Sequence, residues 1–163
     1  MLVIGIDPGT AITGYGIIAE LPDKTLQMVE CGAIRTPAKM AAEERLKTLH
    51  ARLAHILQMH QPDCAAVEKL YFQRNVRTAL QVGQARGVIV LALSQADVPV
   101  YEYNPMDVKL AVTGYGMAEK IQIQQMVKAL LALPQVPKPD DVADALAVAI
   151  CHAHSARLKN LSD

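Results

Sequence analysis

The chain opens on a short apolar run, rich in β-branched residues, that ends abruptly in a turn. Leu2-Val3-Ile4-Gly5-Ile6 is followed at once by Asp7-Pro8-Gly9. A continuous apolar run of this length, closed by turn residues, is typical of a buried strand. A strand buried on both sides needs helices on both faces of its sheet. The opening residues therefore predict a chain that folds around a central, covered sheet.

The rest of the sequence supplies the other parts of that sheet. The patterns predict four more strands, over 13–19, 25–35, 65–68 and 98–103, and five helices, over 38–60, 75–95, 106–112, 118–131 and 140–156. Short links make the first three strands an antiparallel meander, and the fourth strand, reached through a helix, lies parallel to the first. We therefore expect an α/β fold in one domain, residues 1–163, with a five-stranded mixed sheet flanked by helices on both faces.

Composition excludes several classes of protein. Lysine and arginine number 16, as do aspartate and glutamate, so the formal net charge of the 163 residues is zero and a uniformly basic nucleic-acid surface is excluded. An aromatic content of 4% argues against a surface on which many bases stack. The three cysteines form no CxxC pair, and the longest apolar stretch is far shorter than the ~20 residues of a membrane span. We therefore expect a cytoplasmic protein that makes no membrane contact.

Four acidic residues are predicted to meet at one edge of the sheet. Asp7 and Glu68 each end a strand, and because these strands are expected to be parallel neighbours, both side chains face one edge. Asp141 and Asp144 are three residues apart at the start of the last helix and share one of its faces. If that face meets the edge, four carboxylates converge and need a counter-charge, which Mg²⁺ or Mn²⁺ provides. Two such ions can activate a water and stabilise the leaving oxygen of a phosphodiester.

Each of these acids also has an ordinary structural interpretation. Asp7 fits a simple turn before Pro-Gly, and Glu68 fits a surface charge at the end of a strand. Asp140 directly follows a proline and fits a helix N-cap, and Asp141 fits an acid in the first helical turn that offsets the helix dipole. Asp144 is explained least well, because an apolar run follows it and an aspartate beside a buried helix face needs a partner. The combination is therefore more specific than any of its members.

Basic residues gather near the predicted edge although the chain as a whole is neutral. No acidic residue stands between Glu68 and Asp97, and two more lysines flank the later Gly-Tyr-Gly turn. Scattered surface charge is the alternative interpretation of each residue. The candidates for contacts with DNA phosphates are Lys69, Arg74, Arg77, Lys109 and Lys120.

Two adjacent aromatic residues stand in the predicted loop after Glu68. They are Tyr71 and Phe72, and Phe72 is the only phenylalanine in the chain. On a polar loop such a pair suggests stacking or wedging at a distorted base step, whereas the alternative is that one of them packs into the core.

Assembled in this order, the motifs resemble those of the RuvC family of crossover (Holliday) junction endodeoxyribonucleases. The resemblance runs from Leu2 to about His154, with matching order and spacing. The segments that carry it are Ile4–Gly9, Val67-Glu68, Gly83–Gly87, Ala118–Lys120 and Asp141–Ala147.

The resemblance implies an RNase H-like fold and a homodimer that resolves four-way DNA junctions by symmetrically paired, Mg²⁺-dependent nicking in recombination and repair, leaving 5′-phosphate and 3′-hydroxyl ends. A RuvA–RuvB branch-migration complex is implied as a partner. By motif position, the metal-binding catalytic carboxylates are Asp7, Glu68, Asp141 and Asp144, and the basic residues near the cleaved strand are Lys109 and Lys120. Either Tyr71 or Phe72 matches the aromatic residue that contacts the junction centre.

Three other functions remain open from the sequence. Asp7-Pro8-Gly9-Thr10 also resembles the phosphate loop of actin-like and sugar-kinase ATPases, although those proteins need two such domains and a longer chain. A non-catalytic junction-binding protein would need neither Glu68 nor the Asp141 and Asp144 pair. An RNA-processing nuclease of the same fold is the third alternative.

Overall fold

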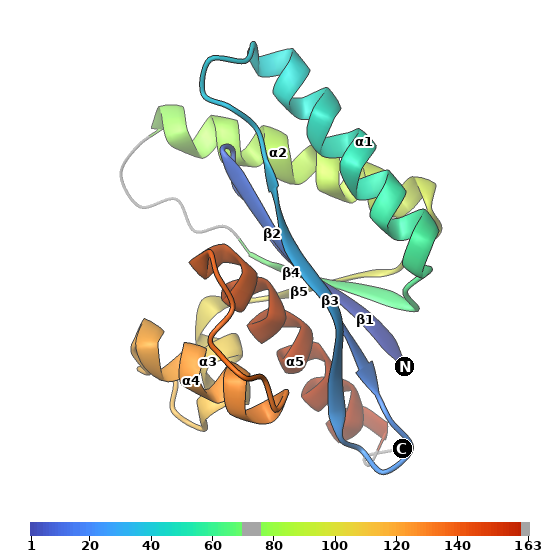
Figure 1. Ribbon diagram of the computed structural model, residues 1–163, viewed down its shortest axis with the longest axis vertical. Coiled ribbons are helices and arrows are strands. Elements are labelled where there is room, and N and C mark those ends of the chain that lie inside the picture. Colours follow the sequence, from blue (N-terminus) through green and yellow to red (C-terminus); the bar gives the residue numbers. More distant parts are fainter. Residues whose placement is uncertain (70–75, 161–163) are drawn as a thin grey trace.

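The described residues form one mixed sheet of five strands. The structure is a computed structural model that describes residues 1–69 and 76–160, the side chains of 76, 77 and 157–160 excepted. The strands are β1 (Leu2–Asp7), β2 (Ile12–Glu20), β3 (Leu26–Arg35), β4 (Cys64–Glu68) and β5 (Val100–Tyr103). Their order is β3-β2-β1-β4-β5; β2 is antiparallel to both β1 and β3, and β4 runs parallel to β1 and β5 (Figure 1). The predicted mixed sheet is confirmed.

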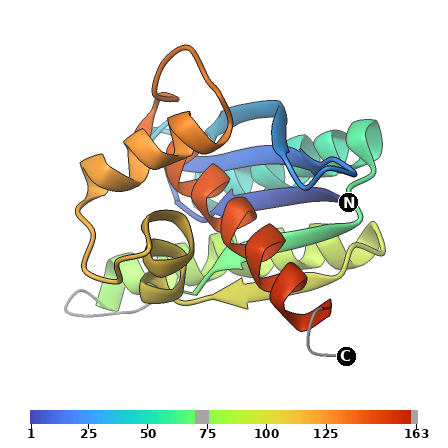
Figure 2. The same cartoon turned by 90° about the horizontal axis from the view of Figure 1, so that it is seen from below.

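Helices cover both faces of this sheet, as predicted. They are α1 (Ala42–His60), α2 (Val76–Gln95), α3 (Pro105–Thr113), α4 (Lys120–Leu130) and α5 (Asp140–Asn160). α1 and α2 pack on one face, while α5 crosses the other face with α3 and α4 beside it (Figures 1 and 2). No helix in the described part of the chain has both the length and the apolar character needed to cross a membrane.

Side chains of β1 alternate between the two helical layers. Ile6 packs in a core cluster with Leu53 of α1, whereas Val3 packs in a second cluster with Leu146 of α5. Because successive strand residues point to opposite faces, Asp7 has the same orientation as Val3. The strand therefore ends with a carboxylate on the face that α5 covers.

Several predicted boundaries differ from the structure by one to four residues, and two of these differences have identifiable reasons. α1 begins at residue 42 rather than 38, because residues 37–40 form a turn in which Met40 N donates to Pro37 O at 3.0 Å. β5 begins at residue 100 rather than 98, because Val98 N donates to Leu93 O at 3.0 Å and so belongs to the turn after α2. Neither correction moves an element to another place in the fold.

Helix α5 lies directly on the backbone of β1 and β2. A Cβ atom added at Gly5 would lie 2.0 Å from the carbonyl oxygen of Ala145, and one added at Gly14 would lie 2.0 Å from that of Asp141. A glycine at each position is therefore required for helix and sheet to approach this closely. The contact fixes the first turns of α5 against the end of β1, because Gly14 pairs with Asp7.

We expect Gly14→Ala to lower the free energy of unfolding by about 1–3 kcal/mol or more, because its methyl group collides with backbone rather than side chain. Gly16→Ala is the matched control on the same strand face, since its Cβ would first meet the Leu146 side chain, at 2.5 Å. Denaturant unfolding of both variants measures the difference. A cost for Gly14→Ala no larger than that for Gly16→Ala contradicts the prediction.

Candidate functional site

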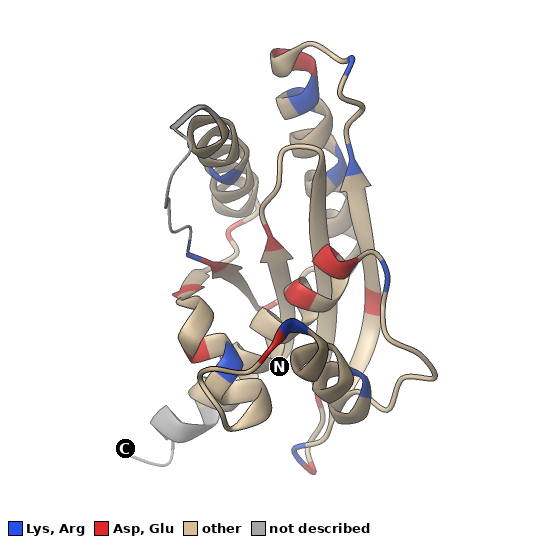
Figure 3. Ribbon diagram, turned by 90° about the vertical axis from the view of Figure 1, so that its left-hand side faces the viewer, with Lys and Arg blue, Asp and Glu red and all other residues tan. Residues whose placement is uncertain are grey.

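Asp7 and Glu68 lie at the same edge of the sheet. In the parallel pair of β1 and β4, Ile6 is opposite Val67, so Asp7 and Glu68 occupy the next position on each strand. Both positions belong to the strand face that α5 covers. Acidic strand ends and the acidic start of a helix lie on one side of the molecule in Figure 3.

The first turns of α5 bring two further acids to this edge. Asp7 interacts electrostatically with Asp144, Glu68 and Asp141. Burial, followed by the negative charges of these three groups, raises the pKa of Asp7 to about 8. The structure therefore places the other three predicted acidic residues within electrostatic reach of Asp7.

The same causes act on two of the other acids. Burial and the charge of Asp144 raise the pKa of Glu68, and Lys120 and Lys109 oppose this shift only in part. Burial also raises the pKa of Asp144, although its hydrogen bond with Lys120 works in the opposite direction. The edge therefore carries more negative charge than its lysines balance, which is the electrostatic condition of a cation site.

Lys120, the first residue of α4, supplies part of the missing positive charge. Its Nζ atom donates to Asp144 Oδ2 at 3.1 Å and lies 3.6 Å from Asp140 Oδ2. The lysine side chain is 54% exposed, so its ammonium sits between this acidic edge and solvent. Such a position allows it to contact either a carboxylate or an approaching phosphate.

Asp140 does not occupy the N-cap position that the sequence predicts. The sequence predicts an N-cap, but α5 begins at Asp140 itself, which places the residue in the first turn. Its Oδ1 atom accepts a hydrogen bond from Lys138 Nζ at 2.8 Å. This bond, together with the positive charges of Lys138 and Lys120, lowers the pKa of the Asp140 carboxyl group.

The predicted DNA-contact residues fall into two groups. Lys69 is exposed just beyond β4, where its backbone N–H donates to Tyr103 O at 2.8 Å, and Lys109 is half-buried on α3 within electrostatic reach of Glu68. Together with Lys120, they place three of the predicted lysines around the acidic edge. The other predicted contacts lie outside the described residues. They are Tyr71, Phe72, Arg74 and the side chain of Arg77.

The donor set fits a hard divalent cation. All four acids offer only oxygen ligands, and a bound cation relieves the repulsion that disturbs the ionisation of Asp7. Over the ranges 1–69 and 76–160, no three acidic, histidine or cysteine side chains already stand close enough to hold an ion as they are.

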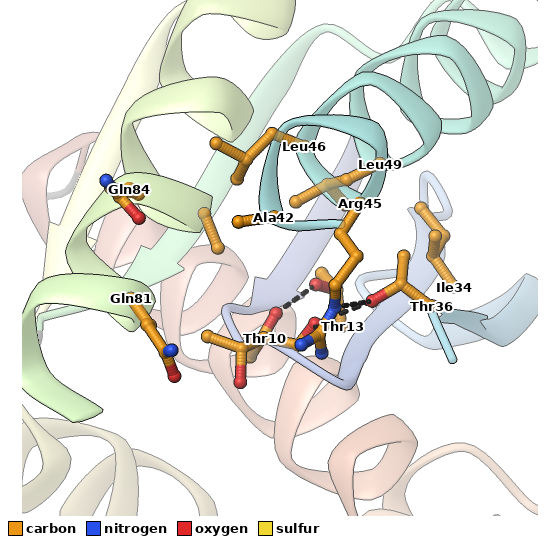
Figure 4. A pocket seen from close by; sticks show the side chains of 12 residues that line it. Thr10, Thr13, Ile34, Thr36, Ala42, Arg45, Leu46, Leu49, Gln81 and Gln84 are labelled. Atoms are coloured by element: carbon orange, nitrogen blue, oxygen red, sulfur yellow. Dashed lines mark hydrogen bonds between the residues drawn. The ribbon is translucent and has the colours of Figure 1, made fainter. Parts of the chain in front are cut away.

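Sequence reasoning missed a polar brace behind the loop that follows Asp7. Arg45 of α1 reaches a pocket between α1, α2 and this loop, where its Nη2 donates to Thr10 O at 2.6 Å and its Nε donates to Thr36 Oγ1 at 3.1 Å (Figure 4). Thr36 Oγ1 itself donates to Thr10 O at 2.7 Å. Arg45 stands at an ordinary polar position of an amphipathic helix, so only the tertiary structure reveals this contact.

Comparison with known proteins is consistent with this geometry. The family model described as crossover junction endodeoxyribonuclease RuvC matches residues 3–152. A crossover junction endodeoxyribonuclease RuvC of Pelotomaculum thermopropionicum is 58% identical over 94% of this chain and 93% of the relative. The Thermus thermophilus RuvC structure superimposes with a TM-score of 0.90 at 38% identity, covering 98% of this chain and 97% of the other.

A five-stranded mixed sheet with these flanking helices, and acids gathered at one sheet edge, defines an RNase H-like nuclease fold. Matches to both sequence and structure extend over nearly the whole chain. The chain belongs to the RuvC family of crossover junction endodeoxyribonucleases.

We expect Asp7→Asn to stabilise the metal-free protein, and to do so increasingly as pH rises from about 5 to 8. A carboxyl group whose pKa is raised from 3.8 to about 8 destabilises the fold above its unfolded pKa, and the full penalty is reached only above the folded pKa. The gain at pH 8 is on the order of 5 kcal/mol.

Thermal unfolding in EDTA across this pH range measures the effect. Asp97→Asn is the control, because Asp97 is exposed and lies in the turn before β5 with φ +54°, a conformation that asparagine tolerates. A stability difference between Asp7→Asn and wild type that does not change with pH contradicts the assignment.

Proposed function

We propose that this chain is a structure-selective endonuclease that resolves four-way (Holliday) DNA junctions by Mg²⁺-dependent, symmetrically paired nicks in recombination and repair. The observation that carries the proposal is the cluster of acids around Asp7. A T. thermophilus RuvC with the same fold (TM-score 0.89, 36% identity) was solved in complex with a Holliday junction substrate, which supports the choice of DNA.

The residues proposed to hold two Mg²⁺ ions, with Mn²⁺ as a substitute, are Asp7, Glu68, Asp141 and Asp144. When bound, such ions lower the pKa of an attacking water and stabilise charge on the leaving oxygen. The chain's own contribution is to keep four oxygen ligands at one half-buried edge. Partial burial keeps bulk water from screening their charges. As in the family, cleavage is proposed to leave 5′-phosphate and 3′-hydroxyl ends.

The lysines around this edge are proposed to bind the DNA backbone. Lys120 and Lys109 face the acids, so they neutralise a phosphate that approaches the negatively charged edge. Contacts farther along the DNA are assigned to Lys69, Arg74 and Arg77, and the contact with the junction centre is assigned to Tyr71 or Phe72.

A homodimer through α2 is part of this proposal. Leu80 and Leu91 are 65% and 50% exposed, and a Cβ added at Gly83 or Gly87 would meet nothing within 4 Å. Their spacing puts these four residues on one side of the helix, where apolar side chains and glycines suit close packing against a second copy. A two-fold dimer matches the pseudo-two-fold symmetry of a four-way junction and so accounts for paired nicks.

The remaining proposals rest on family membership. We propose that residues 1–163 act as one nuclease domain in the cytoplasm, together with a RuvA–RuvB branch-migration complex. The relative from P. thermopropionicum is a bacterial enzyme named for its action on DNA, which supports this location.

We expect Asp7→Asn to slow Mg²⁺-dependent cleavage of a labelled synthetic four-way junction by about a hundredfold or more, because a ligand carboxylate is lost. Junction binding in a gel-shift assay should change by less than about twofold, because phosphate contacts remain. Asp97→Asn serves as the remote control and should cleave as wild type does.

The same assay separates the alternative functions. Binding without Mg²⁺-dependent cleavage by the wild-type protein indicates a non-catalytic junction-binding protein. Faster cleavage of RNA substrates than of the junction indicates an RNA-processing nuclease.

We expect the double substitution Leu80→Glu and Leu91→Glu to convert the protein to a 17.7 kDa monomer, because charges are then placed at the centre of the proposed interface. Light scattering coupled to size-exclusion chromatography measures the mass. Leu110→Glu on α3 is the control, since Leu110 is 56% exposed yet lies in the other helical layer. A dimer that survives the double substitution excludes this interface.

A further inference from the structure

Asp140 is the acid at the site edge that the proposed cation binding does not use, and both of its oxygens face lysines. Oδ1 accepts from Lys138 Nζ at 2.8 Å, and Oδ2 lies 3.6 Å from Lys120 Nζ. The same Lys120 ammonium is 3.1 Å from Oδ2 of Asp144, one helical turn farther along α5. Lys120 therefore stands between two aspartates of one helix, and only Asp144 is a proposed cation ligand.

The two roles of Asp144 compete with each other. An oxygen that accepts a hydrogen bond from an ammonium group is less available to a divalent cation, and the two positive charges repel each other at that distance. Cation binding through Asp144 Oδ2 therefore requires Lys120 to loosen its bond to that oxygen. Without another acid nearby, Lys120 would then lose its hydrogen bond to Asp144 and its side chain would rotate away from the site toward solvent.

The position of Asp140 suits it to keep the lysine in place. Residues four apart on a helix are neighbours on its surface, so a small rotation of the Lys120 side chain exchanges one carboxylate for the other. The bond from Lys138 holds Asp140 from the opposite side. The chain of charges Lys138, Asp140, Lys120 and Asp144 thus alternates in sign along the edge of the site.

We propose that Asp140 is a positioning residue for Lys120. It retains the lysine ammonium at the edge of the site when Asp144 binds a cation, so that this positive charge stays beside the phosphate to be cleaved. The inference rests on the proposed nuclease function only in its last step, because the exchange between the two aspartates concerns the protein and the cation alone.

The first test measures Mn²⁺ binding to the full chain without DNA, from the loss of the free-ion EPR signal. Asp140→Asn should weaken Mn²⁺ binding about three- to tenfold, because Lys120 then loses its ion pair with Asp140 and keeps the one with Asp144. In a Lys120→Met background the same substitution should change binding less than about twofold. Asp140→Glu should retain most of the wild-type affinity.

This double-mutant cycle distinguishes positioning from a general charge effect. Equal losses in the two backgrounds mean that Asp140 acts only by its charge or on the helix dipole, and overturn the proposal; an unchanged affinity in Asp140→Asn overturns it as well. Asp97→Asn removes the same charge from a remote exposed site and should leave Mn²⁺ affinity unchanged. Lys138→Met, which leaves the four proposed ligands, Lys120 and Asp140 intact, should weaken binding in the same direction by a smaller factor.

Single-turnover cleavage of a four-way junction supplies the second readout. Asp140→Asn should lower the cleavage rate at saturating Mg²⁺ without weakening junction binding, because Lys120 is then poorly placed beside the phosphate. A rate equal to that of wild type overturns the positioning role in cleavage. If the wild-type protein does not cleave the junction, the proposed function fails, and the EPR cycle still decides whether Asp140 acts through Lys120.

Discussion

The direct contact of α5 with the sheet backbone is the constraint on which the site depends. Helices usually rest on a sheet through a layer of side chains, but here Gly5 and Gly14 remove that layer under the start of α5. The helix side of the contact is also formed by small residues, because the fully buried Ala145 and Ala149 face Gly5. Without this approach Asp144 would stand a side-chain layer farther from Asp7, and the acids would behave as separate surface charges.

Close approach of like charges has a thermodynamic consequence. The pKa of Asp7 is raised because the folded chain holds it, partly desolvated, beside three other carboxylates. In the absence of a cation the fold therefore carries an unfavourable interaction, which Lys120 and Lys109 reduce but do not remove. Sites that bind ions commonly trade stability for function in this way. The half-exposed lysines suit the task because they can move away, whereas a fully buried counter-charge would block the ligands.

The four acids could be predicted from the sequence because the prediction rests on the regular geometry of strands and helices. Strand ends at a common edge predicted Asp7 with Glu68, and the three-residue spacing predicted a shared helix face for Asp144. The position of Asp140 could not be predicted in the same way. An aspartate after a proline gives the same sequence pattern whether it caps a helix or forms an ion pair with a lysine of another helix, as Asp140 does with Lys120. Arg45 carries no signature at all, since its partners lie on segments that only the tertiary fold brings together.

Two arginines of the opposite helical layer contact segments next to the strands that end in site acids. Arg45 of α1 holds the loop that follows β1, and Arg86 of α2 forms an ion pair with Glu102 of β5, the strand beside β4. Arg86 therefore links α2, the helix with the exposed Leu80 and Leu91, to the strand that pairs with the one ending at Glu68. In the proposed dimer through α2, this ion pair would connect the interface with the sheet edge, which suits an enzyme proposed to make two cuts in register.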